Sequence, residues 1–327
     1  MKILLCIDAD HEPRMVAAYL AERFGGARLA IDLLQVIAPA ATTAVVGTQN
    51  VADGDLGIER ARRRALGHLD GIAATLRALS GTVDVNRHVA VGDIADTVAA
   101  MAERLGSALV VFEPRGRGRL ERWRDTRLCG RLLRLAPCAV ELVRPLAAAP
   151  RSLFNVLVPV PADRVADYPW AGIAALPWPS GTHLQLLGML VGSPHDLPLE
   201  TNAFRLIEDL SCGRALASRA GATLHDASAA LAAAHEGRVT VDYALVEGAD
   251  ADTVTAQLER YRASLILACS PGTATQRGRA LLAPLLAPDP AWRVAMQAPC
   301  TVLVLRNDDV GAFAEPATRD AALLGAR

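Results

Sequence analysis

The sequence predicts an α/β protein made of two tandem doubly wound domains, each a five-stranded parallel sheet of Rossmann-like type. Three observations support this fold class. At 327 residues the chain exceeds the size of roughly 250 residues at which single cores stop growing. A set of motifs occurs twice, and each copy alternates short apolar runs with longer helical stretches, as βαβ units do.

The repeat is clearest in two motifs. Gly92–Val98 reads Gly-Asp-Ile-Ala-Asp-Thr-Val and Gly248–Val254 reads Gly-Ala-Asp-Ala-Asp-Thr-Val, 156 positions later. Ala136–Val140 and Ala298–Val302 share Ala-Pro-Cys-x-Val, 162 positions apart. A repeat of this length indicates two copies of one structural unit.

The strands are expected where short apolar runs recur. In the first copy these are 3–7, 30–37, 83–90, 107–112 and 138–143, and in the second 154–160, 183–191, 239–246, 264–269 and 300–305. We therefore predict a first domain over 1–146, a second over 151–307 and a C-terminal tail over 308–327. Pro145 and Pro150 stiffen the short connection, which favours intramolecular pairing of the domains. Whether the fused pair also forms a homodimer stays open.

Composition excludes several classes of function. The net charge of −1 provides no field to attract nucleic acid. Lys2 is the only lysine, so a P-loop lysine and Schiff-base chemistry are excluded. No apolar run reaches the roughly 18–20 residues of a membrane span, and the N-terminus lacks a signal-type apolar region. The six scattered cysteines predict no metal site and indicate reduced, packed thiols. These features predict a cytoplasmic protein with no membrane or nucleic-acid partner.

The order of motifs resembles the universal stress protein family. The carrying features are a first strand ending in Asp8, a second strand of Leu-Leu-x-Val type ending near Val36, the Gly-Asp before the third helix, a glycine loop and Ala-Pro-Cys-x-Val. The resemblance covers both copies. It implies an adenine nucleotide alpha hydrolase-like fold, a role in bacterial stress, and a tandem member that is a fused pseudo-dimer. It also implies that some members bind ATP through Gly-x-x-Gly-x9-Gly-Ser/Thr.

The candidate ligand site lies at the carboxyl ends of the strands, where a doubly wound sheet opens a crevice. This selects Asp8, Val36 and the segment that follows the fourth strand. The resemblance implies that Asp8 and the Val36 backbone hold the adenosine half of a nucleotide. The alternative for Asp8 is that it, or Asp10, caps the helix that follows Pro13.

The phosphate half of this site departs from the family motif. Glu113 stands where the family has glycine, whereas Gly116 matches, with Gly118 close by. Ten and eleven positions after Gly116, Thr126 and Arg127 replace Gly and Ser/Thr. Glycines let phosphate oxygens reach backbone N–H groups, and Glu113 adds negative charge, so ATP binding in the usual pose is disfavoured.

An arginine-rich segment offers a second route to an anion. Eight arginines between 115 and 134 face only Glu121 and Asp125. If Asp125 or Thr126 caps the helix, Leu128, Leu132 and Leu135 form its buried stripe and Arg127 lies in its first turn. There a cation opposes the helix dipole unless an anion is bound. The alternative is a solvated basic helix face.

The second copy is poorer. Pro161 stands at the position of Asp8, and the glycine loop is reduced to Gly272, so we predict no nucleotide there. Two aromatic motifs, Tyr168-Pro169-Trp170 and Pro177-Trp178-Pro179, replace the first helix and require any helix there to be short. They are either an exposed contact for a partner or small apolar ligand, or packing against the first copy.

The functional hypothesis is a non-catalytic regulatory or binding module. Ser193, His195 and Asp196 are adjacent in an ordinary loop without a nucleophile elbow, so they do not predict a triad. No cofactor is required; ATP or another adenine nucleotide, or another small anionic ligand, is the candidate for the first domain, and a protein partner is the other. A slow ATP hydrolase is the least favoured, because Arg127 replaces the hydroxyl that the family would use.

Overall fold

The chain folds into two compact units, one containing Met1–Val143 and the other Arg144–Ala314. The computed structural model describes residues 1–8, 13–24, 27–38, 51–79, 83–113, 119–143, 154–190, 203–248, 251–270, 298 and 300–306. The tail predicted over 308–327 lies outside the described residues, and the predicted domain limits stay predictions.

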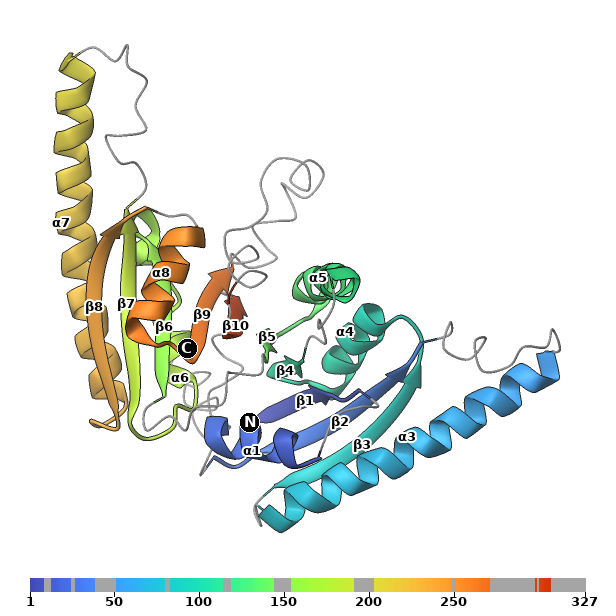
Figure 1. The fold of residues 1–327 in the computed structure, drawn as a ribbon. Coiled ribbons are helices and arrows are strands. Elements are labelled where there is room, and N and C mark those ends of the chain that lie inside the picture. Colours follow the sequence, from blue (N-terminus) through green and yellow to red (C-terminus); the bar gives the residue numbers. More distant parts are fainter. Residues whose placement is uncertain are drawn as a thin grey trace, which may run out of the picture. The chain divides into compact units, whose positions relative to one another are not determined.

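The first unit is a parallel sheet in the order β3-β2-β1-β4-β5. Its strands are β1 (Lys2–Cys6), β2 (Ala30–Ile37), β3 (Asp84–Val91), β4 (Leu109–Phe112) and β5 (Ala139–Leu142). Its helices are α1 (Pro13–Phe24), α3 (Val51–Leu79), α4 (Ile94–Leu105) and α5 (Arg119–Leu135). Figure 1 shows α1 and α3 on one face of the sheet and α4 and α5 on the other. This is the predicted doubly wound α/β fold.

The second unit repeats this order as β8-β7-β6-β9-β10, again with parallel pairs. Its strands are β6 (Asn155–Pro161), β7 (Thr182–Leu190), β8 (Val239–Glu247), β9 (Leu265–Ser270) and β10 (Thr301–Arg306). Its helical segments are the 3-10 helix η1 (Ala162–Asp167), α6 (Trp170–Ala175), α7 (Ala203–Ala234) and α8 (Ala251–Tyr261). All ten predicted strands are confirmed to within two residues.

The apolar runs form strands because both faces of a parallel sheet are covered. In β1 every residue after Lys2 is buried, and β5 is buried throughout. Among the described cysteines, Cys6, Cys129, Cys138 and Cys300 are buried and Cys269 is partly exposed, and none of these five is in a disulfide. Burial raises the pKa of the Cys6 thiol to about 12, with a smaller contribution from Cys138. These cysteines are therefore packed thiols, as predicted.

A buried ion pair joins α1 to β5. Arg23 Nε donates to Glu141 Oε1 at 3.2 Å, and the Tyr19 hydroxyl donates to the same oxygen at 2.5 Å. Burial, followed by the charge of Glu141, raises the pKa of Tyr19 well above its usual 10.0. A charge in a core needs such a partner, because an isolated buried ion is costly.

The repeated motif makes the same contact in both units, in which its glycine packs against its threonine. An added Cβ at Gly92 would lie 2.7 Å from Thr97 Oγ1, and one at Gly248 would lie 2.6 Å from Thr253 Oγ1. Each glycine N–H also donates across the sheet, Gly92 to Ile37 O at 3.1 Å and Gly248 to Leu190 O at 3.0 Å. The motif therefore fixes the turn from the third strand into the next helix in both units.

We expect Gly248→Ala to lower the free energy of unfolding by about 1–3 kcal/mol, because Gly248 has φ +98° and no room for a Cβ. Gly213→Ala in α7 is the matched control: no atom lies within 4 Å of its added Cβ, so it should stabilise by about 0.5–1 kcal/mol. Urea denaturation followed by circular dichroism measures both. Equal effects at the two glycines would contradict the packing argument.

Candidate functional site

Three strand ends of the first unit meet at one edge of its sheet. Because β1, β2 and β4 are parallel, Asp8, Val36 and Glu113 all lie at their carboxyl ends. The Ile7 N–H donates to Leu34 O at 2.8 Å and extends the β1–β2 ladder, which leaves Asp8 at the register position beside Val36. Both residues are partly exposed. The structure therefore brings together the two residues that were predicted to face an adenosine group.

This edge contains the point at which the chain reverses its winding. The helix that follows β1 lies on one face and the helix that follows β4 lies on the other (Figure 1). Between two such strands an open α/β sheet leaves a crevice. Asp8 follows β1 and Glu113 follows β4, so two acidic residues lie at these neighbouring strand ends.

The remaining predicted site residues lie in or before α5. Gly116 and Gly118 are outside the described residues, as is the side chain of Thr126. Because α5 begins at Arg119, Arg127 lies more than two turns inside the helix, and its placement in the first turn was wrong. The residues before Asp125 continue the helix, so no cap forms there. The dipole argument for an anion at Arg127 therefore falls.

The predicted buried stripe of α5 was also wrong in part. Leu132 is buried, but Leu135 is 45% exposed. Cys129 and Gly130 are the other buried residues in the described second half of α5. The buried face of α5 therefore includes the thiol of Cys129, and it differs from the face that Leu128, Leu132 and Leu135 would form.

Arg131 is already held by two carboxylates. Its Nη1 lies 2.8 Å from Asp93 Oδ2 and its Nη2 lies 2.9 Å from Asp96 Oδ1. Asp93 is the N-cap of α4 and accepts from the Asp96 N–H. The hydrogen bond from Arg131, reinforced by those from the α4 backbone, lowers the pKa of Asp93 below its usual 3.8. Arg131 thus links α5 to α4. The count of eight arginines implied that it could bind an anionic ligand, but its guanidinium is already paired with two carboxylates.

The second unit has an aromatic residue at the equivalent edge. The Tyr168 hydroxyl donates to Pro159 O at 2.8 Å. Trp170 Nε1 donates to Val165 O at 2.9 Å, and the buried Trp178 donates to Ile173 O at 3.1 Å. The hydrogen bonds of these rings stay within their own unit, where Trp178 is buried and Tyr168 and Trp170 are partly exposed. Both alternatives for the two aromatic motifs, an exposed contact and packing against the first copy, stay predictions. The short helix predicted there is confirmed by the six residues of α6.

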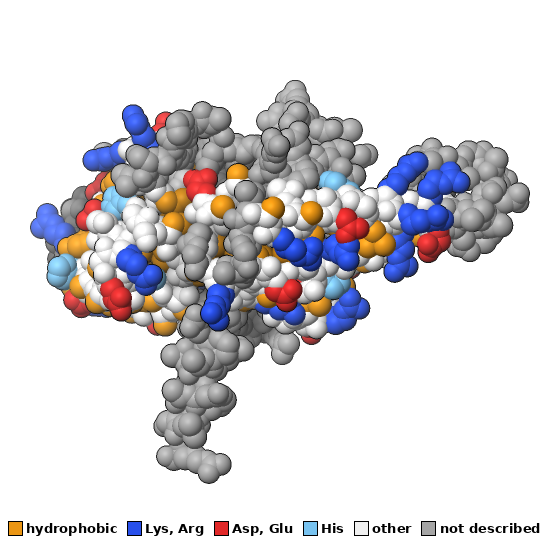
Figure 2. Space-filling view, turned by 90° about the horizontal axis from the view of Figure 1, so that it is seen from below, with side chains coloured by type: hydrophobic (Ala, Val, Ile, Leu, Met, Phe, Trp, Pro, Cys, Tyr) orange, Lys and Arg blue, Asp and Glu red, His pale blue; other side chains and the backbone are white. Residues whose placement is uncertain are grey.

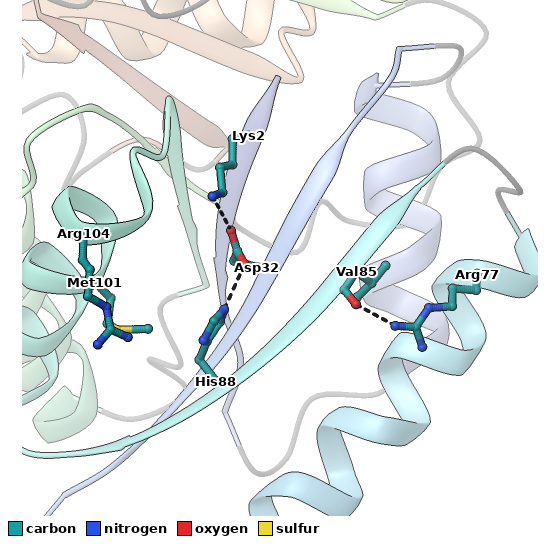
Figure 3. Close-up of polar contacts among 7 residues, drawn as sticks. All are labelled: Lys2, Asp32, Arg77, Val85, His88, Met101 and Arg104. Carbon is teal, nitrogen blue, oxygen red and sulfur yellow. Dashed lines mark hydrogen bonds and ion pairs between the residues drawn. The ribbon is translucent and has the colours of Figure 1, made fainter.

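A second polar cluster lies near the amino ends of β1, β2 and β3 (Figure 3). Asp32 is buried; its Oδ1 lies 2.9 Å from His88 Nε2 and its Oδ2 lies 3.6 Å from Lys2 Nζ. Sequence reasoning missed this cluster and the Arg23–Glu141 pair. The only signal was a single acid inside each apolar strand. Because Asp32 lies at the opposite end of the strands from Asp8, the cluster is not part of the crevice.

The described residues provide neither a metal site nor a membrane span. No group of three or more His, Cys, Asp or Glu side chains among them is arranged to hold a metal ion. None of the described helices is both long and apolar enough to cross a bilayer. Ser193, His195 and Asp196 lie outside the described residues.

Residues 1–144 match the Universal stress protein family. The fold is similar to a universal stress protein from Archaeoglobus fulgidus DSM 4304, with 16% identity and a TM-score of 0.55, covering 93% of this chain and 96% of that one. It is also similar to a functionally unknown protein from Pseudomonas aeruginosa PAO1, with 17% identity and a TM-score of 0.55, covering 97% of each chain. These likenesses concern the fold. No curated relative matches the chain.

Asp93→Ala should lower the free energy of unfolding by about 1–2 kcal/mol, since it removes a helix cap and a surface ion pair. Because the folded pKa of Asp93 is lowered, its contribution is present above the usual value of 3.8 and is lost as pH falls through the lowered pKa. The difference from wild type in urea denaturation should therefore shrink in acid. Asp93→Asn still caps the helix and should cost less than Ala; equal losses would show that capping is not the cause.

Proposed function

We propose that the chain is a non-catalytic binding module of bacterial stress physiology, because its residues 1–144 match the universal stress protein family. Its ligand edge is the β1–β4 crevice of the first unit. Regulation, the stress role and a cytoplasmic location are part of this proposal through the family resemblance. Catalysis is not, because Arg127 replaces the hydroxyl that the resemblance implies near a terminal phosphate.

One observation supports the proposal most directly, which is the convergence of Asp8 and Val36 at the crevice. A carboxylate there can accept hydrogen bonds from ribose hydroxyls, and the partly exposed strand end offers backbone groups to an adenine ring. The second unit has Pro161 in place of the acid. We therefore assign adenine-nucleotide or other anion binding to the first unit alone.

The charges at the crevice favour a ligand with few phosphates. Glu113 follows β4 at the place where the family loop has its first glycine. A carboxylate beside a phosphate is repulsive, and every added phosphate raises that cost. Arg131, held by Asp93 and Asp96, does not offset it. We expect AMP to bind at least as tightly as ATP.

Titration calorimetry with AMP and ATP tests this assignment. Asp8→Ala should weaken AMP binding by about tenfold or more, because hydrogen bonds to a charged group contribute about 1.5–3 kcal/mol. Asp163→Ala removes an exposed carboxylate of the second unit and should leave binding unchanged. Mass spectrometry of denatured protein checks for a nucleotide carried through purification. Absence of heat with every adenine nucleotide, or equal binding by Asp8→Ala, would reject the assignment. Turnover of ATP with Mg²⁺ that Asp8→Ala abolishes would instead favour the hydrolase.

A second candidate function, binding of an acidic protein partner, is favoured by a basic patch on α3. The patch consists of Arg60, Arg62, Arg63 and Arg64, which are all exposed. None of the four has an ion-pair partner in the described part of the chain. Figure 2 shows several basic side chains (blue) close together at the right of the view, with an acidic side chain (red) among them. The apolar Leu66, one turn along, is 37% exposed. Arginines around an apolar residue are typical of protein interfaces.

Charge reversal tests the patch. Arg62→Glu with Arg63→Glu should weaken binding of a fluorescent poly-glutamate peptide by at least about tenfold in fluorescence anisotropy, because two attractive contacts become repulsive. Arg214→Glu with Arg219→Glu changes two exposed arginines of α7 by the same charge and is the control. If both double variants weaken binding equally, net charge and not the patch is responsible.

A further inference from the structure

The two central strands of the second unit separate where Tyr168 lies. The β6–β9 register runs through Val156 with Leu265 and Leu157 with Ile266. Two residues further along β6, Pro159 O accepts the Tyr168 hydroxyl at 2.8 Å. The same hydroxyl also lies near Cys269, close to the end of β9, and Cys269 contributes to the shift of its pKa. One phenol therefore bridges the carboxyl ends of β6 and β9.

This position corresponds to the crevice of the first unit. β6 takes the place of β1, and β9 takes the place of β4, in the same strand order. Topology alone makes the gap between these strand ends the ligand crevice of such a sheet. In the second unit the chain supplies its own aromatic ring at that gap.

The segment that carries the ring is held firmly. η1 follows β6 directly, and its Ala162 and Val165 are buried. The Trp170 ring lies 5.0 Å from the Tyr168 ring, measured between centroids, and Trp170 N donates to Tyr168 O at 2.8 Å. Burial, followed by the charge of Cys269, raises the pKa of Tyr168 well above 10.0, so the hydroxyl stays protonated and can donate. The ring is thus a fixed part of the crevice.

We propose that Tyr168 is a built-in occupant of the β6–β9 crevice, and that the position it fills is a latent binding site for a phenol-sized aromatic ligand with a hydroxyl donor. The hydroxyl of the ligand would donate to Pro159 O, and the backbone N–H of Cys269 would donate to the hydroxyl oxygen. The second unit is therefore closed to diffusible ligands by its own side chain. This inference does not depend on nucleotide binding by the first unit.

Removal of the side chain should open the site. In the full-length chain, Tyr168→Ala should lower the Tm, and added phenol should raise it again by about 3 °C or more, because a ligand that binds the folded form stabilises it. Wild type and Tyr243→Ala, which removes a 41% exposed tyrosine, should gain less than about 1 °C from the same phenol. A folded Tyr168→Ala that gains no more than these controls would overturn the proposal.

Alkylation of Cys269 gives a second readout that does not depend on stability. Peptide mass spectrometry after iodoacetamide should show faster labelling of Cys269 in Tyr168→Ala than in wild type, and slower labelling again with phenol. Cys300, buried in the same unit, reports unfolding and should stay slow. Tyr168→Phe keeps the ring, so its Cys269, which is partly exposed in wild type, should label no faster than in wild type. If Tyr168→Phe labels as fast as Tyr168→Ala, or if phenol does not protect Cys269, the ring does not fill a site.

Discussion

The parallel pairing of β1 with β4, and of β6 with β9, is the constraint on which the rest of each unit depends. In the first unit the chain leaves β1 and β4 toward opposite faces, so α1 and α5 leave the space above these carboxyl ends open. In the second unit the same strand order places β6 beside β9. The first unit places Asp8 and Glu113 beside the gap, whereas the second places the ring of Tyr168 in it. The two copies differ most at the point where their topology is most alike.

The features that both units share serve folding and not ligand binding. Gly92 and Gly248 make the same cross-sheet hydrogen bond and leave the same space for a threonine. A substitution there strains the backbone whatever the ligand. The acid after the first strand is not needed for folding. At the equivalent position of the second unit, Pro161 has no carboxylate and β6 still forms. A repeat can therefore lose a binding residue without losing its fold.

The strands and helices of this protein could be predicted from the sequence better than its candidate site. The ten strands could be predicted because buried parallel strands are continuous apolar runs, and the start of α4 because Asp93 is a strong cap. The start of α5 was misjudged, because its first turns are mostly charged and only Leu120 and Trp123 are large apolar residues before Leu128. The partners of Arg131 lie 35 and 38 residues away, on another helix. The position of the Tyr168 ring could not be predicted, because Pro159 and Cys269 come close to each other only after folding.

The cluster of Lys2, Asp32 and His88 contains the only lysine amine of the sequence. Lys2 is the only lysine, and its Nζ lies 3.6 Å from the buried Asp32 at the strand ends opposite the crevice. Among the side chains of these 327 residues, an amine-directed dye can therefore attach only at Lys2. Such a dye reports from the far end of the first unit's sheet and leaves the crevice chemically untouched. The scarcity of lysine thus makes the wild-type chain a ready substrate for labelling at one end.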